Sequence, residues 1–253
     1  MNLVNPYRFA ADATPPLPLL WWDFDINNDY TNLGTETGSG WDLTEAIGGV
    51  SATSSTIGST SRTVGDFSST GYVEYDASGT KTVAWPGSGN NISMCCWVNF
   101  DTLGSSGGWI ISHRGSTADL LYQMFIWQDN DNADAWVFDN GGLTDIIQAE
   151  TEVDDALTAG TWYHLASTFD LSTGEGKFYI DGVLKRTVTN ANVDNLTTAA
   201  APFVIGVASW SAASSLHYDG KLARVGVFDD VLTAAQINTI YEGEGRPYDE
   251  IWT

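Results

Sequence analysis

The sequence predicts an all-β fold, an antiparallel β-sandwich with one short helix near the C-terminus. Short segments rich in β-branched and aromatic residues recur along the chain, and clusters of Gly, Asn, Asp and Ser separate them. The chain has 26 glycines and shows helical periodicity in one place. At 253 residues and 43% hydrophobic content, it can bury a substantial core without disulfides.

The expected strands follow one another at close spacing. In residues 92–100 the period of two is clean, because Ile92, Met94, Cys96 and Val98 share one face. The Ser/Thr-rich stretch 51–70 is interpreted as edge strands and loops of the same domain. Strands are expected at 19–26, 71–76, 81–85, 92–100, 108–114, 121–127, 134–140, 161–170, 177–188, 202–208 and 221–228.

The expected helix lies within residues 232–245. Thr233 followed by Gln236 is a capping-box pattern that predicts its start. Ile237 and Ile240 are three positions apart and share one face, and glycines at 243 and 245 predict its end.

Residues 1–18 are predicted to form an extended arm, followed by one domain over residues 19–253. The prolines of "TPPLP" favour a polyproline path. Tyr7, Phe9 and Leu17 make the arm more apolar than a solvated tail, so we expect it to dock onto a partner subunit. A disordered end is the alternative.

Charge and cysteine content narrow the class of function. A formal net charge of −22 disfavours binding to nucleic acid or to an anionic membrane, since both require Lys and Arg. The adjacent Cys95 and Cys96 point to opposite faces of a strand and are poorly placed to bridge. They predict synthesis in a reducing compartment and do not form a zinc pattern. No signal peptide or membrane span is visible, so membrane insertion is not expected.

The order of motifs resembles the concanavalin A-like jelly-roll superfamily, specifically the laminin-G-like domains of bacterial and phage surface proteins. "WWDFD", "YVEYD" and "ISMCCWVNF" come first, then "TWYHLASTFD" with "GKFYIDGVLKRTV", and "PFVIGVA", "YDGKLARVGVF" and the helix follow. The resemblance covers roughly residues 19–243 and implies a jelly roll. It does not fix an activity, because the fold hosts lectins, adhesion modules, glycanases and lyases.

Two groups of aspartates are candidate calcium ligands, and the sequence points to no other cofactor. The resemblance implies a structural calcium near the opening strand, where Asp23 and Asp25 stand, but the closing strand carries Ala223 and Arg224 in place of acids. The second group is Asp129, Asp131 and Asp134, which supply hard oxygen ligands but equally suit a hairpin loop.

Catalysis is not expected. His164, Asp170, Glu175 and Asp181 lie close together in the sequence but fall within strands and turns, without a nucleophile held near the histidine. Glu150, Glu152 and Asp154 alternate as paired carboxylates of a glycosidase would, but we interpret them as a solvated loop face.

Four tryptophans are candidates for glycan contacts, because an indole face can stack on a sugar ring. They are expected near strand ends or in loops, and Trp210 stands among small polar residues. The four are Trp109, Trp127, Trp136 and Trp210.

The sequence therefore favours a non-catalytic structural or adhesion protein of a bacteriophage virion surface, as capsid decoration or in a tail. Its partners would be other structural subunits, reached through the arm, and cell-surface glycans. A homo-oligomer is expected, with a trimer as the guess from how particle surfaces are built. A secreted carbohydrate-binding lectin is the alternative, with an extracellular rather than virion location. A glycoside hydrolase or polysaccharide lyase is the third hypothesis.

Overall fold

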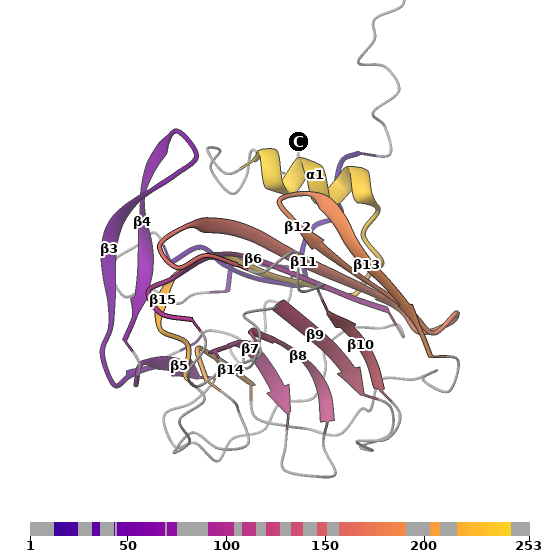
Figure 1. Ribbon diagram of the computed structural model, residues 1–253, viewed down its shortest axis with the longest axis horizontal. Coiled ribbons are helices and arrows are strands. Elements are labelled where there is room, and N and C mark those ends of the chain that lie inside the picture. The colour runs from indigo at the N-terminus through magenta and orange to yellow at the C-terminus, as the bar shows by residue number, and fades with distance from the viewer. Residues whose placement is uncertain are drawn as a thin grey trace, which may run out of the picture.

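Two antiparallel β-sheets face each other across one hydrophobic core in the computed structural model (Figure 1). This confirms the predicted all-β sandwich with one short helix. The predicted strand at 81–85 lies outside the described residues. The structure describes residues 13–24, 32–35, 43, 45–68, 70–74, 91–103, 108–114, 120–126, 133–138, 146–150, 157–190, 203–207 and 217–243.

The first sheet has eight strands, in the order β13-β12-β11-β6-β15-β4-β3, with β1 also paired to β15. We call it sheet A. Its strands are β1 (Leu20–Trp22), β3 (Val50–Ile57), β4 (Thr60–Phe67), β6 (Asn91–Phe100), β11 (Trp162–Asp170), β12 (Glu175–Ile180), β13 (Val183–Thr189) and β15 (Gly220–Phe228).

The second sheet has seven strands, in the order β10-β9-β8-β7-β14-β5-β2, and we call it sheet B. Its strands are β2 (Glu45–Ile47), β5 (Tyr72–Glu74), β7 (Gly108–Arg114), β8 (Leu120–Ile126), β9 (Ala133–Phe138), β10 (Ile146–Glu150) and β14 (Phe203–Ile205). In both sheets, strands far apart in sequence are neighbours, which is typical of a jelly roll.

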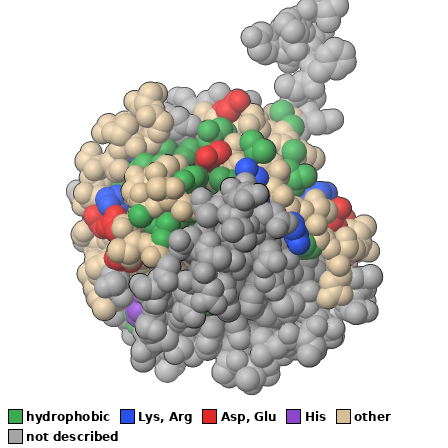
Figure 2. All heavy atoms as spheres, viewed as in Figure 1, with side chains coloured by type: hydrophobic (Ala, Val, Ile, Leu, Met, Phe, Trp, Pro, Cys, Tyr) green, Lys and Arg blue, Asp and Glu red, His purple; other side chains and the backbone are tan. Residues whose placement is uncertain are grey.

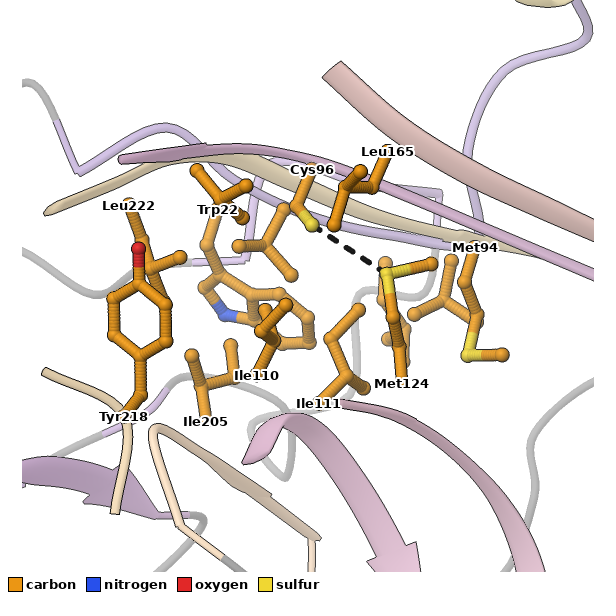
Figure 3. Packing of buried hydrophobic residues seen from close by; sticks show 14 of the residues in the cluster. Trp22, Met94, Cys96, Ile110, Ile111, Met124, Leu165, Ile205, Tyr218 and Leu222 are labelled. Carbon is orange, nitrogen blue, oxygen red and sulfur yellow. Dashed lines mark hydrogen bonds between the residues drawn. The ribbon is translucent and has the colours of Figure 1, made fainter. Parts of the chain in front are cut away.

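The core between the sheets is built from alternate residues of each strand (Figure 3). Met94 and Cys96 of β6 face inward, and the Cys96 thiol lies 3.5 Å from the Met124 sulfur of β8. Trp22 of β1 stacks on Phe203 of β14 with ring centroids 5.2 Å apart, joining the two sheets. Cys95 belongs instead to a cluster on the other face of sheet A, and both thiols are free, as the alternation predicts.

Helix α1 (Ala234–Glu242) covers part of the outer face of sheet A, the face turned away from sheet B (Figure 1). Ile237 and Ile240 pack there with Trp21, Cys95 and other buried side chains. The predicted capping box is present, because the Thr233 hydroxyl accepts from the Gln236 amide while the Gln236 side chain accepts from the Thr233 amide.

Two positions depend on glycine, one in the turn after β12 and one at the start of β15. Asp181 and Gly182 both have positive φ, 51° and 75°, and close the β12–β13 hairpin as predicted. Gly220 has φ of 144°, and a Cβ there would lie 2.1 Å from the Asn99 carbonyl oxygen. β15 therefore enters sheet A so close to β6 that only glycine fits.

Candidate functional site

Four polar residues that lie close together in the sequence, on β11, on β12 and in the turn after β12, form hydrogen bonds or ion pairs within the fold. The His164 amide donates to the Asp181 carboxylate at 2.8 Å, and the Asp181 amide donates back to the His164 carbonyl at 2.8 Å. Asp170 accepts from the amide of Ser172 at 3.0 Å and from its hydroxyl, which lowers the pKa of the carboxyl group. Glu175 forms an ion pair with Lys177 on the same strand. None of these contacts positions an acid against a nucleophile.

The His164 side chain is buried on the outer face of sheet A among aromatic rings. Its ring centroid lies 5.3 Å from that of Trp97 on β6 and 5.9 Å from that of Tyr241 on α1. Among the described residues, neither imidazole nitrogen has a hydrogen-bond partner, and His164 is 1% exposed. Burial, followed by the nearby Arg224 cation, lowers the pKa of His164 to about 3. The ring is therefore neutral at physiological pH.

β1 and β4 pair with successive parts of the same edge of β15, and a charged cluster lies where one gives way to the other. Asp23 lies 3.4 Å from the Arg224 Nε and 3.5 Å from the Arg62 Nη1. Its side chain is 5% exposed and that of Arg224 is 1% exposed, so this ionic contact is desolvated. Arg224 also donates to the Gly243 carbonyl after the end of α1, which ties the helix to the same cluster.

The backbone at Arg224 explains how a cation reaches this position. The pairing of β15 with β6 shifts register between Ala223 and Gly226, which marks a β-bulge. Arg224 has φ of 51°, an uncommon conformation for a residue other than glycine. A bulge re-aims the side chain, here toward Asp23 and the end of α1. The sequence "GKLARVGVF" contains Arg224 but does not predict the β-bulge at this position.

Two partly exposed aromatic residues, Trp162 and Tyr241, pack beside these clusters. Trp162 begins β11 and donates from its indole N–H to the Ser55 hydroxyl of β3 at 3.1 Å. Tyr241 stacks on Trp97 with centroids 5.5 Å apart and an interplanar angle of 22°. Indole and phenol rings can stack on the C–H face of a sugar while nearby hydroxyls hydrogen-bond to it. The sequence analysis did not single out Trp162 or Tyr241 as ligand-binding residues.

Of the four predicted tryptophans, the structure describes the side chain of Trp109. Trp109 lies on β7 and is only 5% exposed, so its indole belongs to the packed interior rather than to a binding surface. Trp136 is in the middle of β9, paired with Gln148 on one side and Gln123 on the other. Its side chain lies outside the described residues, as do Trp127 and Trp210 entirely. Glycan contact by these three stays a prediction.

The structure likewise describes only some of the predicted calcium ligands. The Asp23 carboxylate already faces two guanidinium groups, so its charge is compensated without a metal ion. Asp134 lies on β9, with its backbone paired to Glu150 and Phe125. Asp25, Asp129 and Asp131 lie outside the described residues, as do Glu152 and Asp154. Among the residues that are described, no three His, Cys, Asp or Glu side chains form a group that could hold a metal ion.

Part of the predicted arm lies against the domain. The Gln236 side-chain amide of α1 donates to the Thr14 carbonyl at 3.2 Å, and Pro15 and Pro18 are buried. Leu17, between them, is 55% exposed. Tyr7 and Phe9 lie outside the described residues. Within the described parts of the chain, the structure has no helix with the length and apolarity required to cross a membrane.

Two antiparallel sheets that face each other across one core define a jelly-roll β-sandwich. Residues 67–238, more than half of the chain, match the family model described as the Concanavalin A-like lectin/glucanases superfamily. The chain therefore belongs to this superfamily, as its motifs predict. Comparison with curated protein sequences finds no match.

Solved structures with the same fold include carbohydrate-binding domains. Domain 4 of a GH43 extracellular arabinanase from Geobacillus stearothermophilus, in complex with arabinotriose, is similar at a TM-score of 0.61 and 19% identity, covering 89% of this chain and 98% of that one. The binding domain of Botulinum neurotoxin serotype D is similar at a TM-score of 0.60 and 16% identity, covering 92% of this chain and 51% of that one. The chain thus spans about half of the toxin domain. At these identities the likeness shows the fold.

Proposed function

We propose that this protein is a non-catalytic surface module of a virion, which displays its jelly roll and attaches through its N-terminal segment. The observation that carries the non-catalytic part is the structural use of His164, Asp170, Glu175 and Asp181. The attachment part is supported by Leu17, an exposed apolar residue held on a segment that Pro15, Pro18 and the Gln236–Thr14 hydrogen bond anchor to the domain. Release of reducing sugar from a glycan, abolished by Glu152→Gln, would overturn the non-catalytic assignment.

If Leu17 contacts the particle, Leu17→Asp should remove the protein from it without unfolding the domain. Tagged full-length variants are expressed in cells that produce the particles, which are then purified on a density gradient and probed with an antibody. Wild type should co-sediment with particles, and Leu17→Asp should be at least about tenfold depleted, because a carboxylate cannot be buried in an apolar contact without a partner. The melting temperature should be unchanged, since surface substitutions have small effects.

Val183→Asp is the matched control, because Val183 is equally apolar and 58% exposed but lies on β13. It should co-sediment like wild type. Absence of the wild-type protein from purified particles contradicts the virion assignment. Equal depletion of the two variants contradicts attachment through Leu17.

A carbohydrate-binding lectin is the second candidate function. It is favoured by solved relatives whose titles name sugars, the arabinanase domain with arabinotriose and a toxin domain with N-acetylneuraminic acid. Half-buried Trp162 and the predicted Trp210 are the aromatic residues through which we expect stacking.

On a glycan array, the full-length wild-type chain should bind a defined set of glycans, with arabinan oligosaccharides and sialylated glycans as the first probes. Trp210→Ala should reduce that binding by roughly tenfold, because loss of one stacking face costs about 1.4 kcal/mol. Unchanged circular dichroism serves as the folding control. A flat array for the wild-type chain contradicts the lectin function and leaves display on a particle as the role.

A further inference from the structure

The strand orders of the two sheets end in four edge strands, and three of these carry features that discourage pairing with another chain. β13 bears Lys185 and Arg186, and its partner β12 has a register shift between Phe178 and Tyr179. β10 ends in Glu150 and contacts β12 and β13 of the other sheet. β2 has only three residues. Charges, bulges and short strands are the usual protections of an exposed edge.

β3 is the fourth edge and has none of these protections. All eight of its residues pair with β4 in one uninterrupted register, from Val50 opposite Phe67 to Ile57 opposite Thr60. It is the outermost strand of sheet A, on the left in Figure 1, and among the described residues no backbone hydrogen bond reaches its outer side. About half of its backbone N–H and C=O groups point away from β4, because successive residues of a strand face opposite sides.

Strand β3 and the turn that follows it lack the charge that dominates the rest of the chain. No charged residue occurs from 46 to 61, although the net charge of the protein is −22. The surface over the hairpin is accordingly mostly tan in Figure 2. Two copies of so acidic a chain repel each other over most of their surfaces. At physiological salt this repulsion is screened only beyond about 8 Å, so it acts on surfaces that come into contact. An uncharged edge is therefore where two copies can approach.

Contacts with the body of the domain hold this edge in place. Ile57 of β3 and Val64 of β4 pack against Trp97 and Ala223 on the outer face of sheet A. Arg62 of β4 pairs with Asp23 at 3.5 Å, and Ser55 accepts from Trp162. A pre-ordered strand loses little conformational entropy when it acquires a partner.

We infer that the free edge of β3 pairs antiparallel with β3 of a second copy, so that the two A sheets become continuous across a two-fold axis. The two-fold axis is perpendicular to the sheet. It passes between one residue and the same residue of the second copy, which lie opposite each other with their side chains on the same face. With Thr53 at the axis, Ser51 lies opposite the second copy's Ser55, and Ala52 lies opposite its Ser54. Small and hydroxyl side chains then meet throughout, and Ser and Thr form favourable cross-strand pairs.

Light scattering and sedimentation of the full-length chain, from about 1 μM to about 1 mM, should give a concentration-dependent mass rising from 27.3 kDa to twice that value. Ala52→Lys should raise the dimer Kd at least about tenfold, because lysine on an edge opposes pairing. Ser61→Lys is the matched control: it adds the same charge to an exposed residue of β4, within the hairpin but not on its free edge. It should leave the Kd within about twofold.

Single cysteines at 51–56 then test the register. The native Cys95 and Cys96 are fully buried and do not compete for oxidant. Cross-linking should peak at one position near Thr53 or Ser54, since only the residue at the axis lies opposite its own copy. A monomer throughout the concentration range overturns the inference, as does a trimer. A dimer that Ala52→Lys and Ser61→Lys weaken equally, or uniform cross-linking along β3, also overturns it.

Discussion

Replacing Arg224 by methionine should lower the free energy of unfolding by about 4 kcal/mol. The substitution removes a guanidinium that is 1% exposed and takes one of the two described guanidinium partners from the Asp23 carboxylate, which is 5% exposed. It also leaves the Gly243 carbonyl without its donor from β15. Breaking a buried ion pair from one side costs more than the pair contributes, because the remaining charge stays in a region of low dielectric constant. Urea denaturation at pH 7 gives the difference directly.

Two further variants separate the charge from its geometry. Arg224→Lys keeps the positive charge but cannot contact both Asp23 and Gly243 through a forked group, so we expect roughly half of the loss. Lys177→Met removes a cation from an ion pair whose side chains are 31% and 37% exposed, and should cost less than about 1 kcal/mol. A loss for Arg224→Met as small as that for Lys177→Met would show that the buried cluster does not stabilise the fold.

The parts of the fold that the sequence predicted are those that depend on neighbours in the chain. The period of two in residues 92–100 placed Cys95 and Cys96 on opposite faces of β6, where the structure has them. Asp181-Gly182 predicted the hairpin turn through its tolerance of positive φ. The capping box located the start of α1 for the same local reason.

The candidate site was less accessible to prediction, because distant segments create it. The Arg224 bulge arises where β15 exchanges one neighbour, β4, for another, β1, along a single edge. The burial of His164 requires Tyr241, which belongs to a helix that follows much later in the chain. The stretch 51–70 was assigned to edge strands and loops. This is right for β3, but β4 pairs with both β15 and β3, so which strand forms the edge depends on distant segments.

These tertiary contacts also connect the proposed surfaces with the stability of the domain. Asp23 joins the end of β1 to β4, which presents the β3 edge, while Arg224 joins the same cluster to the end of α1. α1 in turn holds Thr14, three residues before the exposed Leu17. The charged cluster is therefore expected to order both the strand edge and the start of the domain.

Replacing His164 by phenylalanine should change how stability depends on pH. The histidine pKa is lowered from 6.5 to about 3 in the folded state, chiefly by burial and secondarily by Arg224. Between these two values the unfolded chain binds more protons than the folded chain, so the free energy of unfolding falls as pH falls. The slope attributable to His164 approaches 1.4 kcal/mol per pH unit, and the full effect is about 5 kcal/mol. Phenylalanine preserves the ring contacts with Trp97 and Tyr241 but cannot take up a proton.

The measurement compares wild type and His164→Phe by urea denaturation at pH 7, 6, 5 and 4. Carboxylates titrate in both proteins, so their contribution cancels in the difference between the two curves. That difference should be constant above pH 7 and should move in favour of the variant below pH 6. His164→Gln, which also lacks a titrating ring, should show the same change of slope despite losing the aromatic packing. Parallel curves for wild type and both variants would mean that His164 takes up a proton as readily in the folded state as in the unfolded state, and would contradict this prediction.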